Sequence, residues 1–119
     1  MKIIIESGIT IEEIKEMSRK MFGSLVKAVV DVEKGIMAVD GELHADLEVL
    51  LSENGSKRAN LWGINIYPEI EGDERVEFDS MINLKPHLEN RTRGVEDAFI
   101  RGKIIGIVNK LLKNDGISA

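Results

Sequence analysis

The sequence predicts an α+β fold, a single domain in which three helices cover one face of a mainly antiparallel sheet. The chain has 119 residues and no cysteine, so it has the length of one ordinary domain that folds without disulfides. Short β-branched runs alternate with longer stretches in which apolar residues recur every three or four positions. The order of these segments is β-α-β-β-α-β-β-α. Because its first six segments match the ferredoxin-like order, a ferredoxin-like core is one candidate.

The amino-terminal segments predict a strand and then a helix. Residues 2–5 form a short apolar run, typical of a buried strand. Thr10 and Glu13 have the spacing of a capping box, which places the start of a helix at Ile11. The apolar stripe of this helix comprises Ile11, Ile14 and Met17, with Met21 and Phe22 as further candidates before a stop at Gly23.

A β-hairpin and a second helix follow. Residues 25–33 and 36–40 show alternating patterns on either side of a Lys-Gly pair, which predicts a two-residue turn. That turn pairs Val32 with Met37 and Val30 with Val39. Asp40 predicts the N-cap of a helix over residues 42–53, and Asn54-Gly55 predicts its end. The buried stripe of this helix is predicted to be Leu43, Leu47, Leu50 and Leu51.

Two more strands and a long helix complete the chain. Residues 61–67 and 75–84 predict strands, joined by an acidic and exposed connection. Pairing Ile66 with Val76 makes one sheet face apolar and the other polar. The same register pairs Ile64 with Phe78 and Trp62 with Ser80, and it places Gly63, Asn65, Glu77 and Asp79 on the polar face. After Pro86 and a polar loop over 87–94, a helix is predicted over about 95–113, with Gly116 beyond its end.

Composition and charge exclude several classes of protein. The net charge is −5 and the basic residues are dispersed, which argues against a dedicated nucleic-acid binder. No apolar run approaches the roughly 18 residues of a membrane span, and the apolar start is too short for a signal peptide, so we expect a cytoplasmic protein. The missing cysteine excludes thiol catalysis and thiolate metal sites. The sequence identifies no cofactor and predicts no metal site.

The densest polar cluster lies in the second helix and supplies the catalytic candidates. These are Glu42, His44, Asp46 and Glu48. A histidine beside carboxylates can act as a general base or bind a metal, but a metal would need a third ligand from elsewhere, and His87 is the only other histidine. The alternative, which we favour, is a solvated helix face with a histidine oriented by a neighbouring acid.

A second group of candidates could bind a ligand. Arg91 and Arg93 precede the last helix and could hold an anion at its N-terminus, although we favour salt bridges to Glu96 and Asp97. Asn83 and Asn90 could supplement such a site. Asn65 and Asp79 lie beside Gly63 on the predicted polar face, and the open backbone of Gly63 could admit a ligand or another chain. We favour the alternative that Gly63 makes room for a large neighbour, with Tyr67 as a candidate. Ser80 is expected to make room for the indole of Trp62 and not to be a nucleophile.

The last helix carries small residues at four-residue spacing. Ala98, Gly102 and Gly106 share one face, and each interior glycine costs about 1 kcal/mol relative to alanine. This cost predicts close approach of another element, either the first helix, which we favour, or the same helix of a second subunit in a homodimer.

Four segments together resemble a known family. They are Val26-Lys27-Ala28-Val29-Val30-Asp31, Gly41-Glu42-Leu43-His44-Ala45-Asp46, Leu61-Trp62-Gly63-Ile64-Asn65, and Ser80-Met81-Ile82-Asn83-Leu84-Lys85-Pro86 with Asn90-Arg91. The chain resembles, over nearly its whole length, a small prokaryotic family of uncharacterised proteins. The resemblance implies a compact, soluble α+β protein and brings no activity, substrate or catalytic residue.

The sequence favours a non-enzymatic module that binds a small ligand or a protein partner, with a homodimer as one form. The rival interpretation is a small enzyme, such as a metal-assisted hydrolase, that combines His44 with an acid of its own helix and with Arg91 or Arg93. This enzyme requires His44 to line a concave pocket on which an acid and an arginine converge. A third interpretation, motivated by the net charge, is an acidic partner of a basic protein.

Overall fold

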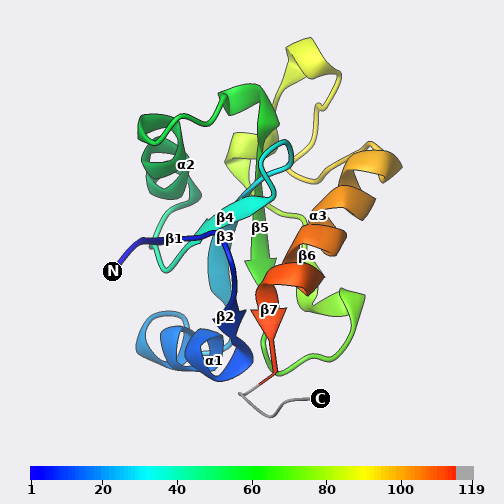
Figure 1. Cartoon of the computed structure of the whole chain (residues 1–119). Helices are drawn as coiled ribbons and strands as arrows, with labels where there is room; N and C mark the ends of the chain where they lie inside the picture. Colours follow the sequence, from blue (N-terminus) through cyan, green and yellow to red (C-terminus); the bar gives the residue numbers. More distant parts are fainter. Residues whose placement is uncertain (115–119) are drawn as a thin grey trace.

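The centre of the molecule is a five-stranded antiparallel sheet, seen in a computed structural model that describes residues 1–114 (Figure 1). Its strands, in spatial order, are β1 (Ile3–Ile5), β4 (Ile36–Val39), β3 (Val26–Asp31), β5 (Leu61–Ile66) and β6 (Val76–Glu77). The three helices are α1 (Ile11–Lys20), α2 (His44–Glu53) and α3 (Ala98–Leu111). The predicted α+β class and the order of the predicted elements are therefore confirmed.

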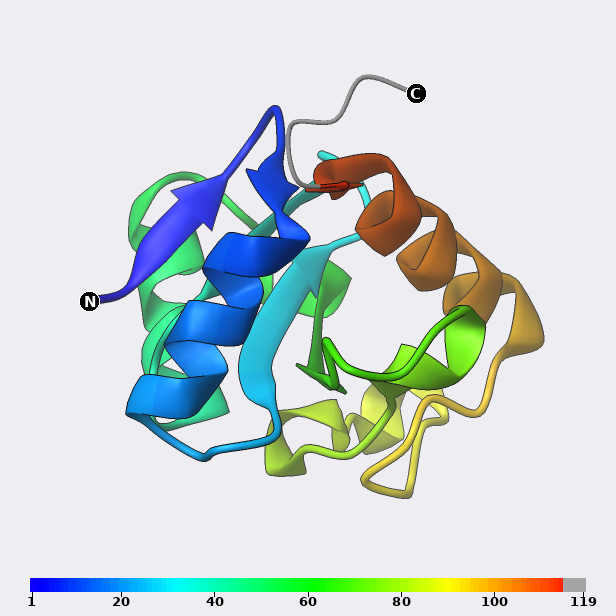
Figure 2. The same ribbon diagram turned by 90° about the horizontal axis from the view of Figure 1, so that it is seen from below.

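The helices lie on both faces of the sheet, so the prediction that they share one face is wrong. Ile14 of α1 and Ile104 and Val108 of α3 are buried against one face, and Figure 2 shows β3 between these two helices. Leu47 and Leu51 of α2 are buried against the opposite face. Successive strand residues point to opposite faces, and β3 and β4 are apolar on both. The apolar side chains on each face therefore have to be buried by a helix.

The strand order also rules out the ferredoxin-like candidate. In a ferredoxin-like core the strand after the second helix pairs with the first strand, and both helices cover one face. Here β5 pairs with β3, β1 lies at the edge of the sheet, and α1 and α2 lie on opposite faces. The sequence did not predict a second, parallel pair between β2 (Ile9–Thr10) and β7 (Leu112–Lys113), the latter lying in the segment predicted as helix. This pair joins the start of α1 to the end of α3. The position of Gly116 lies outside the described residues.

The hairpin between β3 and β4 has a longer turn than predicted. Val30 pairs with Met37 and Asp31 with Ile36, a shift of two residues from the predicted register. The cause is Asp31, which is buried and whose carboxylate accepts hydrogen bonds from the backbone N–H groups of Glu33 and Lys34, both at 2.9 Å. This cap closes a four-residue turn. Because the shift is an even number, the predicted apolar face is retained.

The start of α1 follows the prediction, whereas α2 begins differently. Thr10 and Glu13 form the expected capping box at α1. Asp40 does not cap α2, because it adopts a left-handed conformation with φ +68 and its carboxylate pairs with the Met1 ammonium at 2.9 Å. The helix begins at His44, and Leu43, predicted to be buried, is 56% exposed.

The predicted strand over residues 75–84 is present only as β6. Ile66 pairs with Val76 as predicted, but the chain then leaves the sheet, so the predicted pairs with Phe78 and Ser80 do not form. The short 3₁₀ helices Met81–Asn83 and Pro86–Leu88 follow. Asn83 takes the place of further strand pairing, because its side chain accepts from the Gly63 N–H and donates to the Gly63 carbonyl, at 2.8 and 3.0 Å. Trp62, Ile64 and Ile66 remain buried on the predicted apolar face.

No helix within residues 1–114 combines the length and the apolar character needed to cross a lipid bilayer.

Candidate functional site

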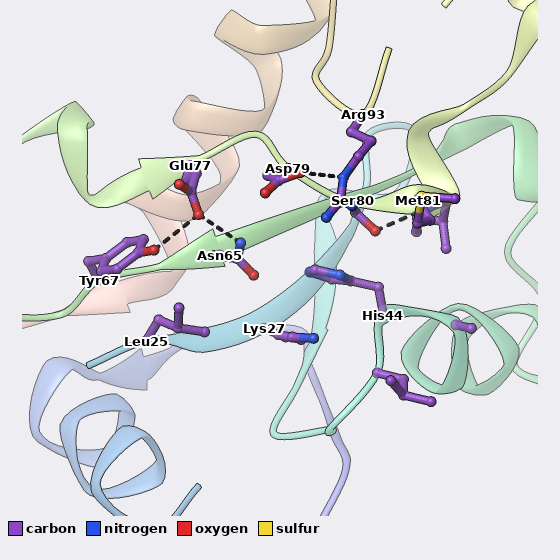
Figure 3. Close-up of a pocket in the computed structure, with 13 residues that line it drawn as sticks. Leu25, Lys27, His44, Asn65, Tyr67, Glu77, Asp79, Ser80, Met81 and Arg93 are labelled. Carbon is purple, nitrogen blue, oxygen red and sulfur yellow. Dashed lines mark hydrogen bonds and ion pairs between the residues drawn. The ribbon is translucent and has the colours of Figure 1, made fainter. Parts of the chain in front are cut away.

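A cavity of about 520 Å³ lies on the sheet face that α2 only partly covers (Figure 3). Its polar lining consists of Lys27, His44, Asn65, Tyr67, Glu77, Asp79, Ser80 and Arg93. Its apolar lining consists of Leu25, Leu43, Ala45, Met81 and Ile82. The cavity is therefore bounded by three strands, the first turn of α2 and the loop that follows β6.

A row of polar side chains across three strands forms the floor of the cavity. The sheet register places Lys27 of β3 opposite Asn65 of β5, and Asn65 opposite Glu77 of β6. Opposed residues of paired strands point to the same face, so the three side chains lie together. The Asn65 amide nitrogen donates to Glu77 Oε1 at 2.8 Å, and the Tyr67 hydroxyl donates to the same oxygen at 3.1 Å. Burial, followed by the nearby Glu77 carboxylate, raises the pKa of Tyr67.

Asn65 has one polar atom without a partner. The side chain is only 7% exposed, and its Oδ1 atom accepts no hydrogen bond from the described residues. The orientation of the amide follows from its neighbour, because a carboxylate accepts hydrogen bonds and therefore faces the NH₂ group. Figure 3 shows Oδ1 directed to the side of the cavity where Lys27 and His44 lie. A buried acceptor without a donor costs about 1–3 kcal/mol, so an external donor would be favourable here.

Gly63 provides the space for the wall of the cavity. A Cβ atom on Gly63 would lie 2.5 Å from Ser80 Cβ and 3.2 Å from His44 Cδ2. The favoured interpretation, that Gly63 makes room for a neighbouring side chain, is therefore confirmed, but the neighbours are His44 and Ser80 and not Tyr67. Ser80 likewise lies against Gly63 and not opposite Trp62, and its hydroxyl accepts from the backbone N–H of Ile82 at 3.2 Å.

His44 is buried at the first position of α2, so the expectation of a solvated histidine is wrong. It is 8% exposed, and its Nε2 lies 2.8 Å from the carbonyl oxygen of Ile64. Since a carbonyl only accepts, Nε2 carries the proton and the neutral ring keeps Nδ1 as an acceptor. Burial lowers the pKa of His44, and the positive charges of Lys27 and Arg93 lower it further, against the opposing effects of the Ile64 carbonyl and Asp79.

Arg93 reaches the cavity from the loop before α3. Its Nε donates to Asp79 Oδ1 at 2.7 Å, whereas the sequence favoured pairing of the arginines with Glu96 and Asp97. Those two acids instead accept from backbone N–H groups: Asp97 from Phe99 and Ile100 as the N-cap of α3, and Glu96 from Arg91. Asp97 does not pair with Arg101, whose guanidinium donates to the carbonyls of Val95 and Glu96.

Two buried asparagines hold the Arg93 loop in place. The Arg93 carbonyl accepts from Asn83 Nδ2 at 2.8 Å and from the Ser80 N–H at 2.9 Å. Asn90 donates to the carbonyls of Asn83 and Gly94, both at 2.8 Å. Neither amide lines the cavity. Their place in the fold supports the positions of Ser80 and Arg93.

The structure brings together only part of the predicted candidates. His44, Asn65, Asp79 and Arg93 line one cavity. Glu42 and Asp46 line a separate cavity of about 290 Å³ beside Asp40, Arg91 is exposed outside the main cavity, and Glu48 lies where its charge acts on Lys85. Glu42, Asp46 and Glu48 therefore do not converge with His44 and an arginine, so that composite site is absent from the described residues.

Sequence reasoning missed Lys27, Tyr67 and Glu77 as site residues. The sequence pattern places Glu77 on the polar face, but Lys27 joins this face only through the pairing of β3 with β5, which sets it opposite Asn65. Aligning the strands by their apolar faces would have found this pair. Within residues 1–114, no three side chains of His, Cys, Asp or Glu gather closely enough to hold a metal ion.

The small-residue face of α3 is open. Ala98, Gly102 and Gly106 are exposed, and no atom of the described residues lies within 4 Å of a Cβ built on either glycine. The favoured prediction, that another element of the same chain packs closely here, is therefore wrong.

Comparison with known proteins identifies the family. Neither the curated proteins nor the solved structures with which the chain was compared contain a significant match. One family does match, over residues 3–111, which covers the sheet, the three helices and every residue that lines the cavity. The chain therefore belongs to the family described as "Protein of unknown function (DUF5674)".

Proposed function

We propose that this protein is a binding module that holds a small polar molecule in the cavity between β3, β5, β6 and the start of α2. The observation that carries the proposal is the buried Oδ1 of Asn65, which has no donor among the described residues. Buried polar atoms in folded proteins are almost always paired, so such an exception inside a cavity supports a ligand that supplies the missing donor.

The size and lining of the cavity support the same proposal. Its volume of about 520 Å³ falls in the range of roughly 300–1,000 Å³ of small-molecule sites. Leu43 and Met81 provide apolar surface beside the polar floor, a combination that such sites use for affinity and orientation. The carbonyl contacts of Asn83 and Asn90 hold one wall in place, which reduces the entropy cost of binding.

The test is a screen of small polar fragments by NMR on the isotopically labelled full chain. We expect fragments to shift the resonances of Asn65, His44 and Ser80. We expect an Asn65→Leu variant to lose this binding, while Asn54→Ala, which removes an exposed amide outside the cavity, retains it. If no fragment shifts these resonances, or if Asn65→Leu binds as the parent does, the proposal fails.

A second candidate is an enzyme in which His44 acts as a general base. Burial lowers the pKa of His44, which lines the cavity, and with Nε2 donating to the Ile64 carbonyl, Nδ1 is left as a neutral proton acceptor. The acid and arginine near it are Asp79 and Arg93, in place of the acids of α2. The same NMR samples distinguish the two candidates. Chemical conversion of a bound fragment that is lost in His44→Gln supports an enzyme, and binding without conversion supports the module.

We also infer that the open face of α3 joins two copies of the chain. Support comes from the exposure of Gly102 and Gly106 and from Phe99, which is 72% exposed on the same helix. Small residues let two helices approach closely, and this approach would compensate for the helical stability that the glycines lose.

A further inference from the structure

The cavity has an acidic end at Glu77 and an end with a net positive charge where Lys27, Arg93 and Asp79 lie. Figure 3 shows Glu77 and Tyr67 on one side of Asn65, and the Lys27 amino group and Arg93 on the side nearer His44. Asp79 lies at the same end as Arg93, because its carboxylate pairs with Arg93 Nε at 2.7 Å. The formal charge is therefore negative at Glu77 and, because Asp79 offsets one of the two cations, still positive at the other end.

The acidic end offers acceptors that are not used. Both hydrogen bonds to Glu77 end on Oε1, so Oε2 has no partner among residues 1–114. Asn65 Oδ1 is also unpaired, and it is directed away from Glu77, to the side where Lys27 and His44 lie. A carboxylate oxygen at this end and a buried amide oxygen on the neighbouring floor of the cavity are suited to an ammonium group, which has three N–H donors and no acceptor.

The basic end offers donors that are not used. Lys27 forms no ion pair with the described residues. Its amino nitrogen lies 5.0 Å from the centroid of the Phe22 ring. Asp79 engages Arg93 through Nε, and the two Nη groups have no partner in the described part of the chain. An ammonium and a guanidinium that face the same space are suited to a carboxylate.

We propose that the ligand is a small zwitterion of the amino-acid class, a conclusion that rests on the binding function proposed above. Its ammonium group would bind Asn65 Oδ1 and Glu77, and its carboxylate would bind Lys27 and Arg93. An anion alone would leave Asn65 Oδ1 without a donor, and a cation alone would leave the Lys27 amino group and the two Nη groups of Arg93 without an acceptor. Leu43 and Met81, both exposed at the same cavity, would contact an apolar substituent of the ligand.

The test compares one zwitterion with its two halves. Using NMR on the labelled full chain, the cavity resonances are titrated with L-leucine, with isocaproate, which lacks the ammonium group, and with isoamylamine, which lacks the carboxylate. A second zwitterion, ε-aminocaproate, covers a longer separation of the two charges. We expect at least one zwitterion to bind more tightly than isocaproate and isoamylamine by about tenfold or more.

Two conservative variants assign the two ends. Glu77→Gln keeps an oxygen that accepts from Asn65 and Tyr67 but removes the negative charge. It should therefore weaken binding of the zwitterion and leave the affinity for isocaproate unchanged. Lys27→Met keeps the aliphatic stem, and it should weaken both the zwitterion and isocaproate. Lys34→Met, at an exposed lysine that does not line this cavity, is the control and should change neither affinity.

The outcomes separate this inference from the one it rests on. The proposal of a zwitterionic ligand is wrong if isocaproate binds as tightly as the zwitterions. It is also wrong if neither zwitterion binds while other fragments occupy the cavity. In both cases the proposed binding function stands. The same holds if Glu77→Gln leaves zwitterion affinity unchanged. If no fragment of any class occupies the cavity, both proposals are wrong.

Discussion

Two asparagine side chains shape the cavity in opposite ways. Asn83 is fully buried, and its amide pairs with both backbone groups of Gly63 and with the Arg93 carbonyl, so it acts as a short substitute for a strand. Asn65 is also buried but leaves Oδ1 unpaired. A paired amide stabilises the fold, whereas an unpaired one is costly unless something else binds to it.

The protonation of His44 makes stability depend on pH. The pKa of His44 is lowered in the folded chain by burial, so between the folded and unfolded pKa values the unfolded chain binds more protons. The free energy of unfolding therefore rises with pH. The contribution of neutral His44 to it is fully present above the unfolded pKa of about 6.5 and is lost as the pH falls below that value. We expect the free energy of unfolding, measured with urea, to fall between about pH 7.5 and 5.5, with a slope of at most about 1.4 kcal/mol per pH unit from this residue.

His44→Gln isolates the contribution of this residue. Glutamine keeps an N–H donor for the Ile64 carbonyl but does not titrate, so the difference in slope between the two proteins belongs to His44. The same pH slope in parent and variant would mean that His44 carries no net effect.

At the scale of single elements, α3 differs from the other helices because its surface contains glycine. No atom of the described residues lies within 4 Å of a Cβ on Gly102, whereas a Cβ on Gly63 of β5 would lie 2.5 Å from Ser80. The physical reason for glycine therefore differs between the two positions. Gly63 is required by close contact within the fold, and Gly102 is not.

We expect Gly102→Ala to stabilise the monomer by about 0.5–1 kcal/mol, because alanine loses less backbone entropy in a helix. Gly63→Ala is the matched control and should destabilise by about 1–3 kcal/mol, since Ser80 would have to move. Urea unfolding at a concentration low enough for monomers measures both. A loss of stability in Gly102→Ala would show that something contacts this face of α3.

At the scale of the whole molecule, one sheet separates two cores of different size. The larger core lies under α1 and α3, and the smaller one lies under α2. Because α2 covers only part of its face, the polar row of Lys27, Asn65 and Glu77 stays accessible beside it. The cavity is thus a consequence of how the layers are arranged, and α3 lies on the other side of the sheet from it.

The proposed dimer through α3 leaves this cavity open, so assembly and binding should be independent. We expect sedimentation at micromolar concentration to give twice the chain mass of 13.3 kDa. Gly102→Arg should shift the protein to the monomer, because a long charged side chain prevents close approach of two helices. A monomer at every concentration tested would contradict the dimer.

Local patterns were sufficient for much of the fold. The capping box at Thr10, the stop at Asn54-Gly55, the pairing of Ile66 with Val76 and the apolar faces of the strands all follow from nearest neighbours and from the two-residue period of a strand. The order of elements and the α+β class were predictable for the same reason. Asn65, Asp79, Arg93 and His44 were found as candidates because each is a polar residue at an unusual place in such a pattern.

Contacts between distant segments decided the rest. Pattern alone does not say which face of the sheet a helix covers, so α2 could be placed only by the apolar residues that β3 and β4 present on both faces. Hydrogen bonds such as those of Asn83 to Gly63 and His44 to Ile64 join residues 20 positions apart, and no local spacing encodes them. The sequence by itself determined the elements and their apolar faces, since these depend on local periodicity. Only the tertiary structure decided which polar side chains meet in the cavity, since that depends on strand register and on the layer that each helix joins.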